Sequence, residues 1–422
     1  MYLIYSYLLV ILGILLSPII LLLFILKPKL RAGFWQKIGF YKKISQKKPV
    51  LWFHAVSVGE VNAVEALIKK ICKNHPEYNI VLTTVTKTGY TVAVDKLGNF
   101  VKEVLYFPYD FNFSVKMAIK AINPCAVIVA ETEIWPNFSH EVKKAGVPLL
   151  IVNGRISPNS YKGYKKFKLF FKNILKNYTL ILMQTEDDKK RIIDIGAPGE
   201  ITEVMGNLKF DVASFLTHEE ICNLKKQLHL CHQQVLIAGS THNGEDEIIL
   251  NVFQQLRKKH NKLKLLIAPR HPERNEKVIR LISETGLNFG LRSKNSNFIE
   301  NEIIVLDTMG ELSKLYSISN IAFIGGSFSN TGGHNPLEAA IYQVPVLSGP
   351  TVFNFKDIYK FLTNTNAAII VKDEKELYSN IDLLLSDQEK YNQISSESKK
   401  IFKLNKGVLD LAMDKIINIV NK

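Results

Sequence analysis

Short β-rich runs alternate with amphipathic helical stretches from residue 50 to residue 373, and this rhythm limits the folds open to the chain more than any other feature. Each run, such as NIVLTTV at 79–85 or AVIVAET at 126–132, is apolar almost throughout. Strands of a parallel sheet have this composition because helices cover both faces of the sheet. The sequence therefore predicts an α/β fold built on parallel sheets.

The rhythm is interrupted once, by a more polar and irregular stretch from about Asn207 to Gln233. A chain of 422 residues is long enough for two domains of about 100–200 residues each. We expect two doubly wound domains facing an interdomain cleft, with ligands at the carboxyl ends of the strands. The predicted order is a first domain at residues 49–210, a connection at 211–233, a second domain at 234–400, and a C-terminal helix at 401–422 that packs back on the first domain.

The first 26 residues contain no charged side chain. At about 1.5 Å per residue, a helix of this length exceeds the ~30 Å hydrocarbon core of a bilayer. A cleaved signal peptide would have a basic start, a shorter apolar run and a small-residue cleavage site, and this segment has none of these features. We predict an uncleaved membrane anchor helix at residues 1–26, which spans the bilayer or, because of Pro18, inserts shallowly. A buried core helix is the alternative.

Residues 27–48 form a basic juxtamembrane segment with eight Lys and Arg residues and no acid. Positively charged flanks of a membrane helix stay in the cytoplasm, so we expect the soluble body on the cytoplasmic face of the membrane. Each basic residue near an anionic surface contributes about 1 kcal/mol to binding it. The first acid of the chain is Glu60, which marks the point where the chain leaves the headgroup region.

The formal charge of +15 also favours anionic partners. Residues 161–178 interleave lysines with aromatic and aliphatic residues, which is typical of an amphipathic helix on an anionic membrane surface. A nucleic-acid patch and a solvated charged face are the alternatives. Beside a membrane anchor we favour lipid and expect no nucleic-acid partner. The four cysteines form no CxxC pair, so neither a disulfide framework nor a zinc site is expected.

The strongest local signal is IAFIGGSFSNTGGHNPLEAA at residues 321–340, where an apolar strand leads into a Gly-rich loop and a helix near Pro336. Glycines allow close approach of a ligand to the backbone, and a helix N-terminus offers free N–H groups, so the segment predicts a phosphate site. A turn capped by Asn335 is the structural alternative. The pattern is neither GxGxxG nor a Walker loop, which disfavours NAD binding and ATP hydrolysis. Glu338 is placed to accept hydrogen bonds from ribose hydroxyls.

Other strand ends of the second domain carry small, polar or basic residues and should meet at the same edge. They are Gly239–His242 after the first strand, Pro269–His271 after the second and Asp307–Glu311 after the third. An arginine such as Arg270 can pair with a phosphate or a base edge. These ends together predict a site for a nucleotide-sized ligand.

The first domain has acids at its strand ends. Glu60 follows the strand LWFHAV and opens a helix, so it is either a general base for an acceptor hydroxyl or an acid that stabilises the helix N-terminus. Glu131 and Glu133 end another strand, and Asn153–Arg155 ends a third. Lys209 is placed to reach the cleft as a cation near a leaving phosphate.

Seven segments together resemble the 3-deoxy-D-manno-octulosonic acid (Kdo) transferases. They are HAVSVGE, ETEIWPN, NGRIS, MGNLKFD, GSTH, APRHPER and GGSFSNTGGHNPLEAA. The resemblance implies a GT-B fold, CMP-Kdo as the donor and a lipid A precursor, lipid IVA, as the acceptor. It implies an inverting glycosyl transfer in lipopolysaccharide biosynthesis at the inner membrane, without a metal or other cofactor.

The resemblance also implies residue roles. Glu60 corresponds to the general base, and Glu131 and Lys209 to residues that stabilise the transition state, with Glu133 as the alternative to Glu131. The residues implied to contact the CMP part of the donor are Pro269, Arg270, Met309, Gly310, Glu311, Asn335, Pro336, Leu337 and Glu338.

Two other functions predict different behaviour. A membrane-tethered nucleotide-sugar epimerase or hydrolase of the same fold would form its product without a lipid acceptor. A basic membrane-surface scaffold would not bind CMP, and it leaves the Gly-rich loop and the strand-end acids unexplained.

Overall fold

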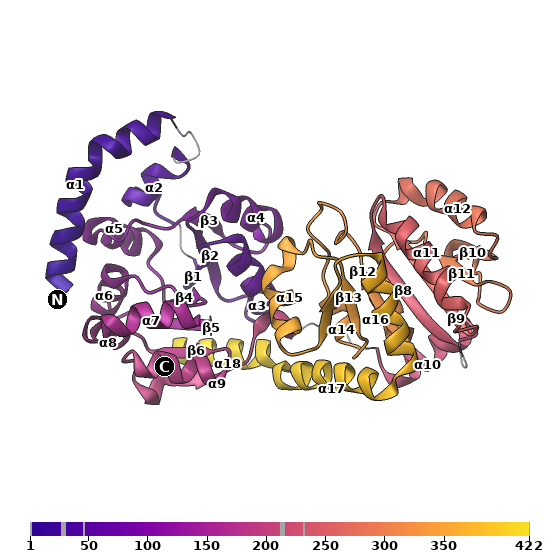
Figure 1. The fold of residues 1–422 in the computed structure, drawn as a ribbon. Helices are drawn as coiled ribbons and strands as arrows, with labels where there is room; N and C mark the ends of the chain where they lie inside the picture. The colour runs from indigo at the N-terminus through magenta and orange to yellow at the C-terminus, as the bar shows by residue number, and fades with distance from the viewer. Residues whose placement is uncertain (1, 27–30, 45–46, 212–215, 231–232, 422) are drawn as a thin grey trace. The chain divides into compact units, whose positions relative to one another are not determined.

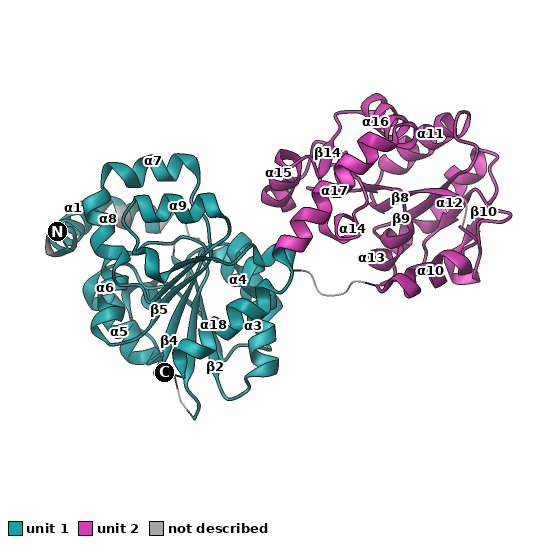
Figure 2. Ribbon diagram, turned by 90° about the horizontal axis from the view of Figure 1, so that it is seen from below, with its two compact units in different colours: residues 1–211, 405–422 teal, residues 212–404 magenta. Residues whose placement is uncertain are grey.

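The structure is a computed structural model that describes residues 2–26, 31–44, 47–211, 216–230 and 233–421. The chain forms two compact units (Figure 2). Unit 1 comprises residues 1–211 and 405–422, and unit 2 comprises residues 212–404. Each unit contains a seven-stranded parallel sheet, so the predicted α/β class is confirmed and is consistent with a GT-B protein.

The sheet of unit 1 has the order β3-β2-β1-β4-β5-β6-β7 (Figure 1). Its strands are β1 Val50–His54, β2 Asn79–Thr84, β3 Glu103–Tyr106, β4 Ala126–Ala130, β5 Leu149–Gly154, β6 Leu180–Met183 and β7 Thr202–Val204. The sequence pattern predicts an apolar run at each of the first six strands, from VLWFHAV at 50–56 to LILMQTE at 180–186. It missed β7, a three-residue strand at the sheet edge.

Helices cover both faces of this sheet because its strands are apolar on both sides. Leu51 and Phe53 pack in one core with residues of α3 Val58–Asn74 and α18 Val408–Val420. Trp52 points to the other core. The helices that contribute to that second core are α5 Asn112–Ile122, α6 Pro136–Lys144, α8 Lys168–Leu175 and α9 Glu186–Asp194. The remaining helices of unit 1 are α1 Tyr2–Leu26, α2 Phe34–Ile38, α4 Lys87–Leu97 and α7 Pro158–Lys166, with short 3₁₀ turns η2 Gly199–Ile201 and η3 Leu208–Phe210.

The C-terminal segment is two helices rather than the single predicted one. α17 Gln388–Asn405 ends before Gly407, which has a φ of 80° that favours glycine, and α18 follows. The Asp211 carboxylate accepts a hydrogen bond from the Leu409 amide at 2.7 Å and so fixes the start of α18 in unit 1. α18 then packs against α3.

The sheet of unit 2 has the order β10-β11-β9-β8-β12-β13-β14. Its strands are β8 Gln234–Thr241, β9 Leu263–Pro269, β10 Phe289–Leu291, β11 Ile303–Val305, β12 Ile321–Ile324, β13 Val346–Ser348 and β14 Ala368–Ile370. The helices are α10 His218–Gln227, α11 Glu245–Arg257, α12 Asn275–Glu284, α13 Leu312–Leu315, α14 Leu337–Ala340, α15 Lys356–Asn364 and α16 Glu374–Ser386, with 3₁₀ turns η4 Pro272–Arg274, η5 Arg292–Lys294, η6 Tyr316–Ile318 and η7 Phe353–Phe355. The stretch at 211–233 was predicted to be irregular, but it contains α10, which Thr217 and Glu220 begin with a capping box. The short edge strand β10 was also missed.

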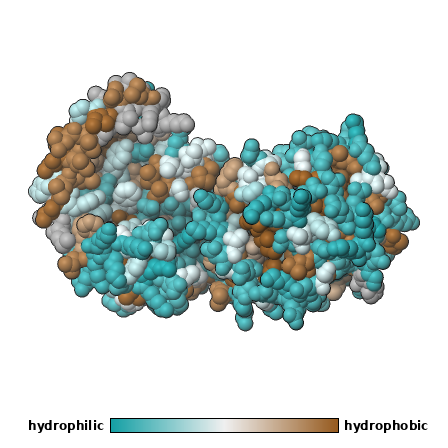
Figure 3. Space-filling model, in the orientation of Figure 1, coloured by the Kyte–Doolittle hydropathy of each residue, from teal (hydrophilic) through white to brown (hydrophobic). Residues whose placement is uncertain are grey.

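The apolar N-terminal segment forms α1, a 25-residue helix that contains Pro18. Many of its large hydrophobic side chains are exposed, and this surface is brown in Figure 3. Among the described residues, no helix meets the length and apolarity required to cross a membrane.

The start of α1 is held to unit 1 by polar side chains. The Tyr2 hydroxyl donates to Asn112 Oδ1 at 2.7 Å, and the Tyr5 hydroxyl donates to Asp110 Oδ2 at 3.0 Å. The Tyr2 ring also stacks on His140 of α6. The first turns of α1 thus bind the body of unit 1, while later turns expose apolar residues.

The lysine-rich segment 161–178 is not one amphipathic helix, because α7 ends and α8 begins around Phe167. Lys165 and Lys168 both pair with Asp194 of α9, at 2.8 and 3.3 Å. Part of the positive charge of this segment is therefore balanced within unit 1.

Candidate active site

Glu60 lies in the first turn of α3, immediately after β1, and its side chain is buried. Its Oε2 atom accepts a hydrogen bond from the Val56 amide at 2.6 Å, and its Oε1 atom accepts one from the Ser57 hydroxyl at 3.1 Å. Ser57 is the N-cap residue of α3. The turn between strand and helix therefore fixes the carboxylate at the carboxyl edge of the sheet.

The pKa of Glu60 is raised to about 7. Burial is the largest cause, and the charges of Glu133 and Glu131 raise it further, while the hydrogen bonds from Val56 and Ser57 lower it. A carboxyl group whose pKa lies near neutral pH can take up and release a proton at little cost, which suits a general base.

Glu131, Glu133 and Lys209 belong to the same part of unit 1. Glu131 directly follows β4 and has a φ of 56°, which is uncommon for a residue other than glycine. Lys209 Nζ lies 3.4 Å from Glu131 Oε1. Burial, followed by the charge of Glu131, raises the pKa of Glu133 to about 6. The structure thus brings the three predicted acids and the predicted lysine into one electrostatic cluster.

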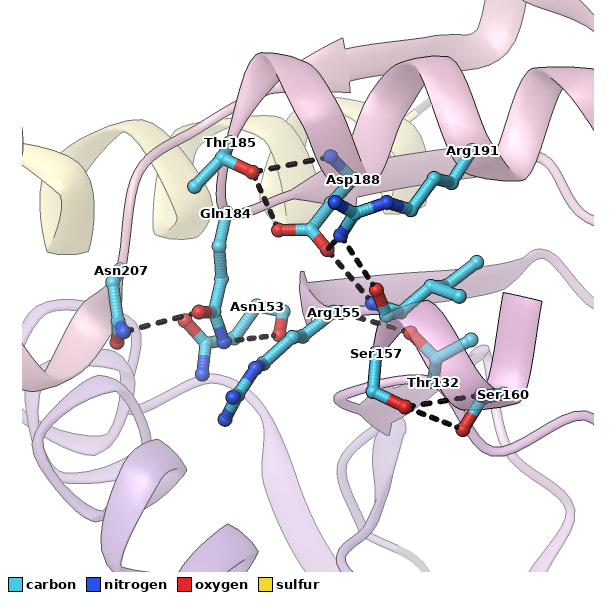
Figure 4. Close-up of polar contacts among 11 residues, drawn as sticks. Thr132, Asn153, Arg155, Ser157, Ser160, Gln184, Thr185, Asp188, Arg191 and Asn207 are labelled. Atoms are coloured by element: carbon cyan, nitrogen blue, oxygen red, sulfur yellow. Dashed lines mark hydrogen bonds and ion pairs between the residues drawn. The ribbon is translucent and has the colours of Figure 1, made fainter. Parts of the chain in front are cut away.

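Lys209 is positioned by a polar network that connects strand ends (Figure 4). Asn153, which is fully buried at the end of β5, accepts the Leu208 amide at 3.0 Å through Oδ1. The Asn153 carbonyl accepts a hydrogen bond from Gln184 Nε2 at 3.0 Å, and Gln184 Oε1 accepts one from Asn207 Nδ2 at 3.1 Å. The network holds η3, and with it Lys209. Gln184 and Asn207 were not predicted, although each directly follows an apolar or small-residue run.

Arg155 follows Asn153 and Gly154 at the same edge. Its amide donates to Thr132 Oγ1 at 2.8 Å, which links the loops after β5 and β4. In Figure 4 its guanidinium points away from Asp188 and Ser157. The ends of β5 and β4 therefore lie side by side at this edge of the sheet.

In unit 2, the predicted strand ends lie side by side because β11, β9, β8 and β12 are neighbours in the sheet. Ser240 has a φ of 57°, and at this point the register shifts so that Thr241 pairs with Pro269. The Arg270 amide then donates to the Thr241 carbonyl at 3.0 Å. The loops after β8 and β9 are therefore joined directly.

The Gly-rich loop differs from the prediction in one respect. The buried Glu245 carboxylate accepts the amides of Gly326, Ser327 and Phe328 at 2.7 to 2.8 Å, and also the amide of His242 at 2.8 Å. The first N–H groups of the loop are thus already bonded to an anion of the protein itself. Glu245 was not predicted, although an acid in the first turn after a strand was the available signal.

The other predicted nucleotide contacts lie in the adjoining loops. Asn335 Oδ1 accepts a hydrogen bond from the Leu337 amide at 3.1 Å, at the start of α14, whose N-cap residue is Pro336. Burial raises the pKa of Glu338, whereas the side chain of Asn335 and the charge of Arg270 lower it. The geometry therefore places Arg270 near the predicted helix end.

Met309 is exposed and Gly310 has a φ of 84°, so the loop after β11 presents its backbone at the edge. Glu311 Oε2 accepts Thr308 Oγ1 at 2.9 Å and Arg292 Nε at 3.1 Å, which fixes this loop; Arg292 was not predicted. In the described part of the chain, no group of three or more His, Cys, Asp or Glu could hold a metal ion.

Comparisons with known proteins identify relatives of both units. Residues 32–212 match the family model described as 3-deoxy-D-manno-octulosonic-acid transferase (kdotransferase), and residues 242–401 match the model of group 1 glycosyl transferases. The chain is 35% identical to a 3-deoxy-D-manno-octulosonic acid transferase of Haemophilus influenzae over 94% of this chain and 95% of that protein.

Two further similarities were found. A bifunctional glycosyltransferase/methyltransferase of Fusobacterium nucleatum is 38% identical over 84% of this chain and 56% of its own length. The crystal structure of the C-terminal CMP-Kdo binding domain of WaaA from Acinetobacter baumannii matches at 31% identity and a TM-score of 0.41, over 43% of this chain and 96% of that one. The extent of the match to the Haemophilus protein and to the family model is decisive, and the chain belongs to the Kdo transferase family of glycosyltransferases.

Proposed function

We propose that this Kdo transferase moves Kdo from CMP-Kdo to a sugar hydroxyl of a lipid A precursor, lipid IVA, in lipopolysaccharide biosynthesis, with Glu60 as the general base. The observation that carries the proposal is the state of Glu60: a buried carboxyl at a strand end, with a pKa of about 7. At neutral pH a large fraction of such a group is ionised, and it binds a proton more tightly than an ordinary glutamate does.

The proposed transfer is a single displacement. Glu60 takes the proton from the acceptor hydroxyl, whose oxygen forms a bond to the anomeric carbon of Kdo. The bond from that carbon to the phosphate oxygen breaks, and its electron pair leaves with CMP. Attack from the face opposite the phosphate inverts the anomeric configuration.

Lys209 and Glu131 act together in this proposal. Their 3.4 Å contact fixes the lysine ammonium within the acidic cluster. A fixed ammonium can offset the negative charge that develops as the phosphate departs, and it needs no reorganisation at that moment. Glu133, which also has a raised pKa, is the alternative second acid. The proposed step uses no metal or other cofactor.

The donor nucleotide is assigned to unit 2. Arg270 is the proposed phosphate ligand, the exposed backbone at Met309–Glu311 the proposed contact of the base, and Glu338 the acceptor for ribose hydroxyls. The shared edge formed by β11, β9, β8 and β12 supports this assignment. That donor and acceptor meet in a cleft between the domains remains part of the proposal.

We further propose that α1 and the basic segment at 27–48 hold the enzyme on the cytoplasmic face of the inner membrane. Of the α1 side chains whose burial the structure describes, twelve large hydrophobic ones are more than one third exposed, which is unusual for a protein in water alone. Because the first turns of α1 are bonded to the body through Tyr2 and Tyr5, we favour a shallowly inserted helix that keeps unit 1 against the headgroups. The lipid acceptor would then reach the site without leaving the bilayer.

The test is transfer by purified enzyme with CMP-Kdo and a tetraacylated lipid A precursor, followed by mass spectrometry of the lipid. Glu60→Gln should bind CMP normally and lose transfer by several orders of magnitude. Glu65→Gln, on the same helix, is the matched control, because Glu65 pairs with Lys69 and Lys96 and has no proposed role in the reaction. Near-normal transfer by the Glu60 variant would exclude it as the base. Release of CMP without any lipid present would instead indicate an epimerase or hydrolase.

A further inference from the structure

Two histidines of unit 2 meet at the carboxyl edge of the sheet, and neither was assigned a role above. His242 follows β8, and His334 ends the Gly-rich loop after β12. Their Nε2 atoms are 2.9 Å apart, and their rings are parallel to within 11°. The ring of His271, from the loop after β9, lies 5.5 Å from that of His242. Three adjacent strand ends thus each contribute an imidazole.

The contact between the two Nε2 atoms requires that one nitrogen donates and the other accepts. Only one proton can lie between them, so the two rings cannot both carry a proton on Nε2 at this distance. The acceptor ring must be neutral, with its proton on Nδ1. The pair in this arrangement therefore carries less positive charge than two separate imidazolium groups would.

The surroundings of the pair favour an anion. The charged or titratable groups that face His242 are Glu245, His271, Arg274 and Arg270, and those that face His334 are His242, Arg270 and His271. The pKa of His334 is lowered to about 4, by burial first and then by His242, Arg270 and His271. The pKa of His242 is also lowered, mainly by burial.

The acids and the second arginine near this cluster are already paired. Glu245 accepts four backbone amides, and Arg274 is bonded to Asp246 and to the Thr241 carbonyl. The Arg270 guanidinium, in contrast, forms no salt bridge within 4.0 Å with any described acid. Arg270 is therefore the cation of this cluster that no salt bridge occupies, and its charge also reaches Glu338, whose pKa it lowers.

We propose that His242 and His334 bind the phosphate of the donor nucleotide together with Arg270, and that the pair takes up a proton when the phosphate enters. A phosphate oxygen between the rings replaces the contact between the nitrogens with two N–H···O bonds. This requires a proton on each Nε2. The ring that already carries a proton on Nδ1 gains a second one from solvent and becomes an imidazolium, which the negative charge of the phosphate stabilises. The inference rests on the proposed CMP-Kdo donor, and it adds two ligands to that site.

This assignment also accounts for the bonding of Glu245. The amides of Gly326, Ser327 and Phe328 are bonded to its carboxylate, so they are not available to a phosphate. Glu245 also bonds to the His242 amide, and His334 donates its amide to the Gly325 carbonyl at 3.2 Å. The Gly-rich loop thus holds the two imidazoles in place instead of holding the anion by its own N–H groups.

The test measures binding of two ligands to the full-length enzyme in detergent by calorimetry, between about pH 6 and pH 8.5, where imidazole groups titrate. The first is the methyl ester of CMP, a phosphodiester like the donor, which keeps one negative charge across this range. The second is cytidine, which lacks the phosphate. The ester should lose up to about tenfold in affinity per pH unit over part of the range, because one proton is linked to its binding, while cytidine affinity should stay constant.

His242→Gln and His334→Gln should each weaken ester binding and flatten its pH dependence, because glutamine can donate a hydrogen bond but does not titrate. His75→Gln, in unit 1 and far along the chain, is the control and should retain the full dependence. The wild-type enzyme supplies a second measurement that does not depend on the variants folding. Ester binding in two buffers of different ionisation enthalpy should reveal proton uptake, and cytidine binding should not.

Each outcome decides the proposal. Ester affinity that is independent of pH in the wild type, or a dependence that persists in both glutamine variants, would show that the pair is a structural bridge between loops. Wild-type enzyme that binds neither ligand at any pH would overturn the CMP-Kdo donor itself, and the histidine assignment with it.

Discussion

Replacing Glu60 with Gln should stabilise unit 1 at about pH 8, even though it removes a hydrogen-bonded carboxylate from the first turn of α3. The pKa of Glu60 is about 7 in the folded protein, against 4.5 for an ordinary glutamate. Below about pH 4.5 the folded and unfolded states both hold the proton. As the pH rises from about 4.5 to about 7, the unfolded state releases the proton first, so the free energy of unfolding of the wild type falls.

The loss is complete above the folded pKa, and its size follows from the two pKa values. At 1.36 kcal/mol per pKa unit the difference corresponds to about 3 kcal/mol. Glutamine does not titrate, and its side chain can still accept the Val56 amide, so the variant avoids this loss. For a unit of this size the gain is roughly 6 to 12 °C in melting temperature at about pH 8, with little difference at about pH 4.5.

The assay is differential scanning fluorimetry of both proteins over this pH range, following the transition of unit 1. Glu65→Gln is the control on the same helix, and it should have the opposite sign. Lys69 and Lys96 lower the pKa of Glu65, so its ionised form stabilises the fold at about pH 8 and the variant should lose stability there. If Glu60→Gln also lowers the melting temperature at about pH 8, Glu60 is a stabilising helix-end acid and the reasoning for a base fails.

Three other changes test the rest of the site. Glu133→Gln removes one of the negative charges that raise the pKa of Glu60, so the acidic limb of the pH profile of kcat/KM should move to lower pH. An unchanged limb would mean that Glu133 does not affect the pKa of Glu60. Lys209→Met should lower kcat by about 10²- to 10³-fold with little change in the KM for the donor, measured by steady-state kinetics; an effect on KM alone would make it a binding residue. Glu245→Gln places an NH₂ group among four backbone donors, which should cost unit 2 about 3 kcal/mol by thermal or urea unfolding. An unchanged free energy of unfolding of unit 2 would mean that the loop amides are not bonded to Glu245.

The sequence was sufficient to predict the parallel strands and the strand ends that meet in each unit, because apolar runs and the residues after them are local signals. It was insufficient for β7 and β10, since strands of three residues carry too few side chains to show a pattern. It also predicted one helix at 161–178 where the structure has two, because the spacing of lysines does not reveal the break around Phe167.

Contacts between distant loops were the other kind of feature that the sequence could not supply. Gln184 and Asn207 each follow an apolar or small-residue run, but only the fold shows that they join Asn153 in one hydrogen-bonded network. The contact between His242 and His334 could not be predicted either, because the two residues are 92 positions apart in the chain. Local patterns thus identify the edge of each sheet, and the fold decides which side chains share a proton or a charge there.

Two of the four Gly-Glu pairs of the chain show why the surroundings of an acid decide its role. Glu60 follows Gly59 after β1, and Glu245 follows Gly244 after β8. Each lies in the first turn of a helix, and each is buried. Glu245 accepts four backbone amides, which use both of its oxygens and fix a loop around it. Glu60 accepts one amide and one hydroxyl and is exposed to the charges of two other acids, which raise its pKa towards neutrality. The Glu245 carboxylate thus holds a loop in place, whereas a buried carboxylate with few donors and acidic neighbours, such as that of Glu60, has a raised pKa. The same dipeptide therefore yields a structural anion in unit 2 and the candidate base in unit 1.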